Sequence, residues 1–370
     1  MSGMSWESPL FATLAADYPR EPRAGEPDLL GDADRRLAGG EITPEEHLAI
    51  AREFIGVVLA EEEASGLAML TDGCVATEDR LQPLVDGLGG TSTPRSVALP
   101  DGAEVRAPRF DRDPRWQEPI TVDAWRWADD TSDIMVKQVL IGPYTMARLA
   151  DPGGAPREVL ALGLAEALNQ ELRALVAAGC PVIQVDEGAL TTIGDDAAEW
   201  DLYGETQRRL TAGLEEHHLS LGLYRGGIDP AGHATILDGP YRSYLVDALG
   251  GPDAWRFVFA VPAEIGVVIG ALDASSTALD ETEVMVWAMA WAGEAERTAA
   301  RVGIASNGSL RAVGRFAARR KIELMGEAVR VASMGPLREV AEALDPTPLD
   351  SKMGPLREVA AAVEAARRPR

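Results

Sequence analysis

The stretch VIQVDEGAL, Val182–Leu190, is an apolar run that ends in two adjacent carboxylates, Asp186 and Glu187. A buried strand that ends in paired acids is costly unless the acids bind a cationic group or accept hydrogen bonds from backbone amides. Capping of a helix accounts for one acid at most. We therefore expect a strand to end here and Asp186 or Glu187 to have a functional role.

Short apolar runs of the same kind alternate with helical patterns along the chain. A capping box at Thr43 and Glu46 begins one helix, and Gly179 ends another. Because the predicted strands are mostly separated by helices, the pattern predicts an α/β protein with a (β/α)8 TIM barrel. An open doubly wound sheet is the alternative, weakened because no GxGxxG turn opens the first helix. The predicted strands are Leu10–Ala15, Leu67–Thr71, Met135–Leu140, Val182–Val185, His218–Leu223, Arg256–Ala260, Gly266–Leu272 and Arg301–Ala305.

The domain organisation predicted from these patterns is a single barrel over residues 1–333 with one insertion. Residues 84–130 are rich in Gly, Pro, Asp and Arg and too long for a plain loop. They predict a small hairpin, SVALPDGAEVRAP, over the barrel mouth and a short helix near Thr121–Ala128. Residues 334–370 predict a helical tail that carries MGPLREVA twice, at 334–341 and 353–360. A local duplication explains the repeat, and a homodimer or accessory partner bound through the tail is the alternative.

Composition narrows the class of protein. The chain of 370 residues has 59 acidic and 35 basic side chains and a formal charge of −24, which argues against nucleic acid and anionic membranes as partners. Two cysteines, Cys74 and Cys180, provide no disulfide framework. The N-terminal stretch lacks the pattern of a signal peptide, and no run is long enough to span a membrane. These features predict a cytoplasmic protein that binds a small molecule.

Polar side chains follow most of the predicted strands. In a (β/α)8 barrel the carboxyl ends of the strands carry the chemistry, so convergence of these groups predicts a binding site, although Asp72, Asp273 or Asn307 alone could be a helix cap. The candidates are Asp17, Cys74, Tyr144, Asp186, Glu187, His218, Ser220, Tyr224, Arg225, Asp273, Ser275 and Asn307.

The stretch HHLSLGLYRGG, His217–Gly227, has the spacing of a metal-ligand pair at His218 and Ser220. A zinc site would have a thiolate where Ser220 stands. The stretch is therefore an intact metal site, a remnant of one, or an ordinary strand.

Two motifs resemble the catalytic barrel of the cobalamin-independent methionine synthase family. VKQVLIGPYTMARLA, 136–150, matches its GP-x-T turn, and LAEALNQELRALVAAGCPVIQVDEGAL, 164–190, matches its IQ-x-DEPAL signature. DYPREP, 17–22, LAMLTDGC, 67–74, and ASNGSLRAVGRFAARRKIELM, 305–325, resemble the family's GSYPR, TDGE and P-x-CGL segments. The resemblance covers Leu10 to Ala332 and implies a barrel of the methionine-synthase/uroporphyrinogen-decarboxylase type.

The family transfers a methyl group from a folate to a thiol, which a zinc ion activates through a histidine, two cysteines and a glutamate. The resemblance aligns these ligands with His218, Ser220, Asn307 and, at the end of the predicted sixth strand, Ala260. Only the histidine is kept, so we expect no tetrahedral zinc site, and His233 does not restore one.

The resemblance also implies a changed substrate pocket. Asp17 stands where the family has the serine of GSYPR and would repel a carboxylate, Cys74 replaces the glutamate of TDGE, and Ser275 replaces a histidine proton donor. We therefore expect a zinc-independent methyl or one-carbon transferase that acts on a non-thiol acceptor in specialised metabolism, with a folate as the candidate methyl donor.

In this reading Asp186 or Glu187 binds a cation or acts as a base, and His218 is the general acid or base. Arg225 would hold an anionic group, whereas Arg109 is expected on the surface. A non-catalytic accessory barrel is one alternative. Lyase or decarboxylase chemistry is another, although no motif selects it.

Overall fold

The computed structural model describes residues 10–22, 25–151, 154, 156–250, 252–294, 297–345 and 347–348. Its centre is a seven-stranded parallel sheet in the order β1-β9-β8-β7-β6-β5-β4. Buried apolar side chains fill these strands on both faces, as a parallel sheet covered by helices requires. The strands are β1 Phe11–Ala12, β4 Gln138–Ile141, β5 Ile183–Asp186, β6 Leu219–Leu223, β7 Ser243–Asp247, β8 Gly266–Leu272 and β9 Val302–Ser306.

A segment around Met69 and Leu70 closes the sheet into a barrel. Thr13 pairs with Met69 and Leu70 pairs with Val136, both in parallel, so that this segment lies between β1 and β4. The amide of Leu70 donates to the carbonyl of Met135 at 2.9 Å. The segment is the second barrel strand, and the predicted (β/α)8 barrel is confirmed.

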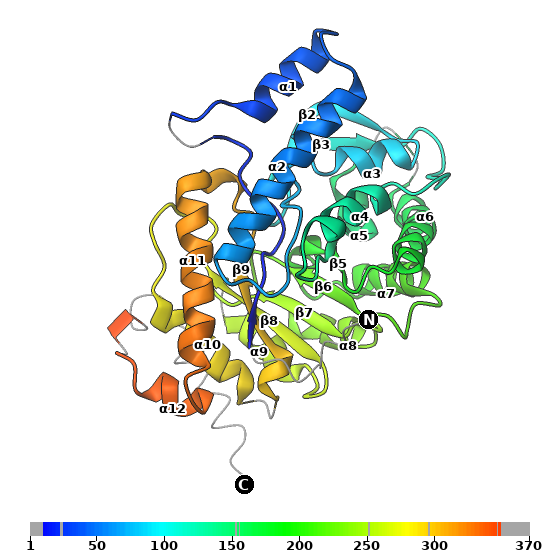
Figure 1. Cartoon of the computed structure of the whole chain (residues 1–370). Coiled ribbons are helices and arrows are strands. Elements are labelled where there is room, and N and C mark those ends of the chain that lie inside the picture. The colour runs from blue at the N-terminus through cyan, green and yellow to red at the C-terminus, as the bar shows by residue number, and fades with distance from the viewer. Residues whose placement is uncertain are drawn as a thin grey trace.

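Helices surround the barrel (Figure 1). The Thr43 capping box and the left-handed Gly179 begin and end α2 and α6 as the sequence predicts. No described helix combines the length and apolar character that crossing a bilayer requires. The helices are α1 Leu29–Ala38, α2 Pro44–Ala64, α3 Gln82–Gly87, α4 Val122–Thr131, α5 Pro143–Leu149, α6 Arg157–Ala178, α7 Ala197–Thr211, α8 His233–Leu237, α9 Pro252–Ala260, α10 Thr282–Gly293, α11 Arg315–Ala332 and α12 Leu337–Glu342.

The predicted strand Arg256–Ala260 is wrong, because these residues form the end of α9. Ala254, Trp255, Phe257, Val258 and Val261 are buried, which is the spacing of one helix face rather than of a strand. The sixth barrel strand is instead β7, whose sequence SYLVD was not recognised as a strand. Its carboxyl end is therefore Asp247, not Ala260.

The insertion forms the predicted hairpin, with β2 Thr91–Ala98 antiparallel to β3 Glu104–Arg109. The hairpin is a separate two-stranded sheet that lies beside α3 (Figure 1). The amide of Ser309, after β9, donates to the carbonyl of Asp101 in the hairpin turn at 3.1 Å. The turn thus lies at the carboxyl end of the barrel, as predicted.

The first MGPLREVA copy contains the start of α12, which packs beside α10 and α11 (Figure 1). The buried Ala341 and the partly buried Leu337 and Val340 join the main hydrophobic core. The second copy, 353–360, lies outside the described residues.

Candidate functional site

Asp186 and Glu187, adjacent at the end of β5, are both buried but face different surroundings. The Glu187 carboxylate accepts hydrogen bonds from the amides of Tyr144 at 3.1 Å and Thr145 at 2.7 Å, in the first turn of α5. These amides have no partner within their own helix. Glu187 therefore holds α5 against the barrel, and burial raises its pKa to about 7 despite these bonds.

Asp186 faces the interior of the barrel. Its Oδ1 accepts hydrogen bonds from Gln184 Nε2 at 2.8 Å and from the Tyr224 hydroxyl at 3.0 Å. Burial raises the pKa of Asp186 to about 7, against the lowering effect of nearby Arg80. A carboxylate whose pKa lies near neutrality is suited to accept a proton.

Arg80 links three carboxylates at the carboxyl end of the barrel. Its Nη2 donates to Asp101 in the hairpin turn, and its Nη1 lies 3.5 Å from Asp17 and 3.6 Å from Asp186. The Arg80 side chain is only 5% exposed. We call Asp17, Arg80, Asp101, Asp186 and Tyr224 the mouth cluster.

Several buried atoms of this region have no hydrogen-bond partner among the described residues. They are both carboxylate oxygens of Asp17, Oδ2 of Asp186, Nε and Nη1 of Arg80, and Nε of Arg311. Arg311 approaches Asp17 at 3.8 Å. Buried polar atoms are nearly always paired, so a concentration of unpaired ones marks a place for water or a ligand.

A polar chain extends from Asp186 into the barrel. Lys137 Nζ donates to Gln184 Oε1 at 2.7 Å and to the carbonyl of Leu14 at 2.6 Å. Burial lowers the pKa of Lys137 to about 8, and burial raises the pKa of Glu62, near Lys137, to about 8. The chain orients the amide of Gln184 so that its Nε2 points at Asp186.

Backbone strain is concentrated at the same end of the barrel. Among the described residues, only Cys74 (φ 50°) and Arg225 (φ 51°) have positive φ without being glycine. Such conformations cost energy and cluster at functional sites. Cys74 is close enough to Asp17 that the carboxylate helps to raise its pKa, with burial as the main cause. Cys74 is therefore a neutral thiol beside the mouth cluster.

The carboxyl ends of β6, β7 and β9 present Tyr224, Asp247 and Asn307. Asn307 Nδ2 donates to Asp247 Oδ1 at 3.1 Å, and that oxygen also accepts from the amide of Leu249 at 3.0 Å. No group of three His, Cys, Asp or Glu side chains in the described ranges is arranged to hold a metal ion. This donor set does not fit the tetrahedral zinc of the resembled family.

His218 directly precedes β6 and therefore lies at the amino end of that strand, away from the mouth cluster. Its Nε2 lies 3.0 Å from the hydroxyl of Ser243, the first residue of β7. Burial lowers the pKa of His218 to about 4. Six residues of extended chain, about 20 Å, separate it from Tyr224. Ser220, paired with Gln184 in the sheet, also lies below the mouth cluster.

The other predicted site residues divide between the barrel mouth and its surroundings. Arg225 is exposed and its guanidinium lies against Gly102 in the hairpin turn. The Tyr144 hydroxyl donates a hydrogen bond to Glu199 of α7 at 2.5 Å rather than to a residue of the mouth cluster. Asp273 accepts from the amide and hydroxyl of the exposed Ser275, which is a local turn. Arg109 forms an exposed pair with Asp111 at 2.8 Å.

No sequence pattern indicated a role in the site for Arg80, Asp101, Gln184, Lys137 or Arg311. Asp101 lies in a Pro-Asp-Gly segment, which indicates only a turn. Only the prediction that the hairpin covers the barrel mouth indicated that Asp101 could lie there. The positions of Arg80 and Arg311 depend on contacts between distant loops.

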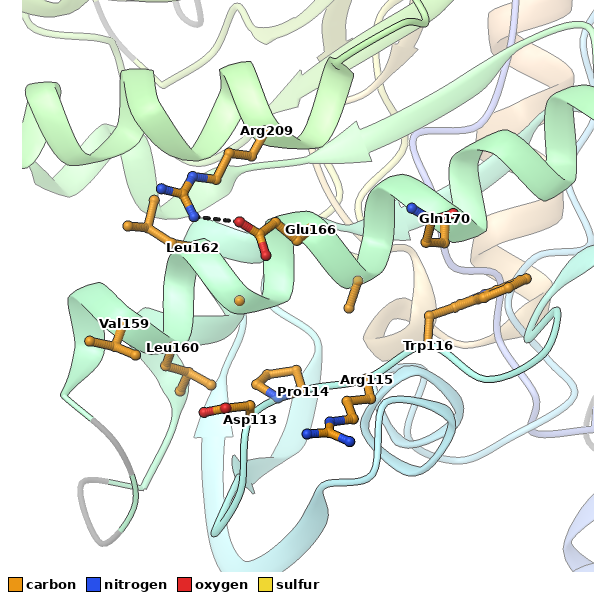
Figure 2. Close-up of a pocket in the computed structure, with 12 residues that line it drawn as sticks. Asp113, Pro114, Arg115, Trp116, Val159, Leu160, Leu162, Glu166, Gln170 and Arg209 are labelled. Atoms are coloured by element: carbon orange, nitrogen blue, oxygen red, sulfur yellow. Dashed lines mark hydrogen bonds and ion pairs between the residues drawn. The ribbon is translucent and has the colours of Figure 1, made fainter.

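A separate groove of about 550 Å³ lies between residues 113–116 and α6 (Figure 2). Two of its lining residues, Arg209 of α7 and Glu166 of α6, form an ion pair at 2.5 Å. None of its lining residues belongs to the mouth cluster, and none has an unpaired buried polar atom among those described. We therefore assign the candidate site to the barrel mouth.

The fold and the mouth cluster define a (β/α)8 barrel with a buried polar site at its carboxyl end. Solved structures share this fold. A B12-independent methionine synthase from Shewanella sp., in complex with selenomethionine, superposes with a TM-score of 0.72 at 16% identity and covers 91% of this chain and 100% of its own. A methyltransferase from Methanosarcina mazei superposes with a TM-score of 0.59 at 14% identity, covering 87% of this chain and 94% of its own.

Sequence comparison finds related proteins. Residues 30–211 match the model of the cobalamin-independent synthase catalytic domain. A methionine synthase from Saccharolobus solfataricus is 27% identical over 191 residues, 51% of this chain and 56% of its own. A 5-methyltetrahydropteroyltriglutamate–homocysteine methyltransferase from Caulobacter vibrioides is 28% identical over 199 residues, 53% of this chain and 25% of its own. The chain spans about half the length, or less, of these curated relatives.

Proposed function

We propose that the chain is a methyl or one-carbon transferase whose acceptor atom is a nitrogen or oxygen rather than a thiol sulfur. The observation that carries this proposal is the set of buried, unpaired oxygens on Asp17 and Asp186 beside Arg80. Oxygens of this kind accept hydrogen bonds from an amine or hydroxyl. The relatives named as methionine synthases support the class of reaction.

Asp186 is the proposed general base. Gln184 and Tyr224 hold its Oδ1, which leaves Oδ2 to accept the proton of the acceptor N–H or O–H. The acceptor atom then attacks the methyl carbon. The bond between that carbon and the donor nitrogen breaks, and the electron pair stays on the donor nitrogen, which takes up one proton in balance with the proton that Asp186 took from the acceptor and releases again. The folate named in the Caulobacter relative is the donor we propose.

In this proposal the mouth does not activate a thiol through a zinc ion, as the resembled family does. Tyr224, Asp247 and Asn307 are poor or incomplete ligands for zinc, so the proposed reaction has no step through a metal. A nitrogen or oxygen acceptor needs a base rather than a metal-bound thiolate, and Asp186 has the geometry and the pKa for that role.

The test is methyl transfer by purified protein from a methyl-folate to a panel of amines, alcohols and homocysteine, with products detected by mass spectrometry. We expect an amine or alcohol product whose rate falls by about 10²–10⁴-fold in Asp186→Asn. Asp195→Asn, at an exposed carboxylate, is the matched control and should keep the wild-type rate. Methylation of homocysteine alone would refute a non-thiol acceptor.

A second candidate, a non-catalytic accessory barrel, is favoured by one observation: the hairpin turn fills the mouth with the 1% exposed Asp101. Calorimetric titration with methyl-folate and the same panel separates the two. Absence of binding, together with full biological activity of Asp186→Asn, would support the accessory role.

A further inference from the structure

The tip of the hairpin, Pro100-Asp101-Gly102, is built into the barrel mouth. Asp101 is 1% exposed, and its Oδ2 accepts a hydrogen bond from Arg80 Nη2. Its Oδ1 accepts from the amide of Ala103 at 3.0 Å. The carboxylate of Asp101 is thus the group from the insertion that reaches the mouth cluster.

Glycines shape the place that the tip occupies. A Cβ on Gly308, after β9, would lie 2.6 Å from the Asp101 carbonyl oxygen, and a Cβ on Gly188, after β5, would lie 2.5 Å from Cβ of Pro100. A Cβ on Gly102 would lie 2.2 Å from Arg225 Nη2. The loops after different barrel strands therefore receive the tip only because these positions lack side chains.

The tip leaves the groups beneath it incompletely paired. Arg80 donates a hydrogen bond through Nη2 alone, while its Nε and Nη1 have no hydrogen-bond partner in the described part of the chain. The adjacent oxygens of Asp17 and Asp186 Oδ2 are also without one. A carboxylate binds a guanidinium best through two parallel hydrogen bonds, which Asp101 does not provide.

The hairpin is joined to the barrel by packing of buried side chains such as Leu99 and Val105 and by a few hydrogen bonds, not by strand pairing. It pairs with no barrel strand, and most of β2 is exposed or half-buried. Its hydrogen bonds come from the amides of Ser309 and Asp151 to hairpin carbonyls, from the amide of Arg106 to Asp79, and from Arg95 to the carbonyls of Leu149 and Ala150. Displacement of the tip breaks no sheet ladder of the barrel.

We propose that Asp101 occupies a carboxylate-binding site of the mouth, and that a small-molecule ligand places its own carboxylate on Arg80 when the hairpin tip moves out. This inference deepens the proposed function, and it rests on that function in taking the mouth as the substrate site. Arg80 then makes two hydrogen bonds to the ligand carboxylate, and the donor groups of the ligand reach Asp17 and Asp186. The ligand class is a small molecule with a carboxylate and an N–H or O–H group.

Chemical rescue tests the carboxylate site. Asp101→Gly removes a side chain that acetate reproduces, so acetate should raise the unfolding midpoint of this variant by about 4 °C, saturably, relative to equal sodium chloride. Wild type and Asp111→Gly, which loses an exposed carboxylate paired with Arg109, should show no such shift. Acetamide should not replace acetate, and Asp101→Gly/Arg80→Met should not respond. Equal shifts in wild type and Asp101→Gly would overturn the proposal.

Labelling of Arg80 with phenylglyoxal, read by peptide mass spectrometry, tests movement of the tip and does not need the Asp101 variant to fold. Gly308→Ala places a methyl group against the tip, so Arg80 should react roughly threefold faster or more than in wild type, and acetate should slow the reaction. Gly56→Ala, whose Cβ meets nothing closer than 3.8 Å, is the matched control. Identical Arg80 rates in all variants, with or without acetate, would overturn the proposal. Neither readout uses methyl transfer, so the carboxylate site and the proposed function can fail separately.

Discussion

The two halves of the barrel differ in how closely they follow the family. The matched segment, residues 30–211, contains β4 and β5 together with Arg80, Asp101 and Asp186. The match ends at Thr211, before β6. The fold nevertheless continues, because the Shewanella structure covers 91% of this chain. The second half completes the barrel fold and contributes Tyr224, Asp247 and Asn307 to the mouth.

The difference between the halves shows that different residues determine the barrel fold and the chemistry at the strand ends. A barrel strand needs buried apolar residues and backbone pairing, and many sequences supply both. The chemistry at a strand end depends on single side chains. In the second half the strands persist while their ends present Tyr224, Asp247 and Asn307. The matched segment, in contrast, carries Arg80 and the Oδ2 of Asp186 that has no hydrogen-bond partner among the described residues.

The largest effect should come from the first half, at Arg80. Arg80→Met leaves Asp17, Asp101 and Asp186 without their shared cation, so the free energy of unfolding should fall by about 3–5 kcal/mol. Urea unfolding at pH 7 measures it. Arg256→Met removes an exposed pair with Asp253 and is the control. A loss for Arg80→Met no larger than that of the control would show that the cluster contributes nothing to folding.

The next largest effect should be a difference in stability between variants of Asp186 and Glu187, the two acids at the end of β5. Glu187→Ala leaves the amides of Tyr144 and Thr145 buried and unpaired, which should cost about 2–3 kcal/mol of unfolding free energy. Asp186→Asn should cost less, because an amide oxygen still accepts from Gln184 and Tyr224. The same urea experiment compares the two. A larger loss of unfolding free energy for Asp186→Asn than for Glu187→Ala would mean that Asp186, and not Glu187, has the structural role.

This contrast also shows what the sequence determines. The capping of α5 by Glu187 joins residues 42 apart in the chain, so VIQVDEGAL alone does not predict it. The same stretch does correctly predict a strand that ends in two acids, because a strand is a local feature. The helix ends at Thr43 and Gly179 are local features too. The FVFA run of α9 misleads because a short apolar run is compatible with a strand or a buried helix face. Arg80 and Asp101 meet only through the folding of the insertion, so no local pattern identifies them.

In the second half, His218 should affect the pH dependence of stability rather than catalysis. Its pKa is lowered from 6.5 to about 4, so the unfolded chain binds the proton more tightly between these values. Its contribution to stability is therefore present above pH 6.5 and lost as the pH falls toward 4. His218→Gln should remove a loss on the order of 1–3 kcal/mol over this window.

The measurement is the difference between wild-type and His218→Gln unfolding free energies from pH 4 to pH 7. The pKa values of Asp186 and Glu187, raised to about 7, act in the opposite direction, since their contribution is lost as the pH rises toward 7, and they cancel in this difference. Methyl transfer at pH 7 should stay within roughly twofold of wild type, because a general base outside the mouth has no route to the acceptor. A loss of activity comparable to that of Asp186→Asn would restore His218 as the catalytic residue.

The smallest effect should be that of added zinc on the metal content and the unfolding midpoint of the protein. Asp247 already accepts hydrogen bonds from Asn307 and Leu249, and the neighbouring Tyr224 and Asn307 are poor ligands. We expect metal analysis of protein equilibrated with zinc and then dialysed to find well under one zinc per chain, with Asp247→Ala no different. The unfolding midpoint should not respond to zinc or to a chelator, because an ion that binds the folded state would raise it. Stoichiometric zinc that depends on Asp247 would instead mean that the strand ends rearrange around a metal, and the second half of the barrel would then have kept the family's chemistry as well as its fold.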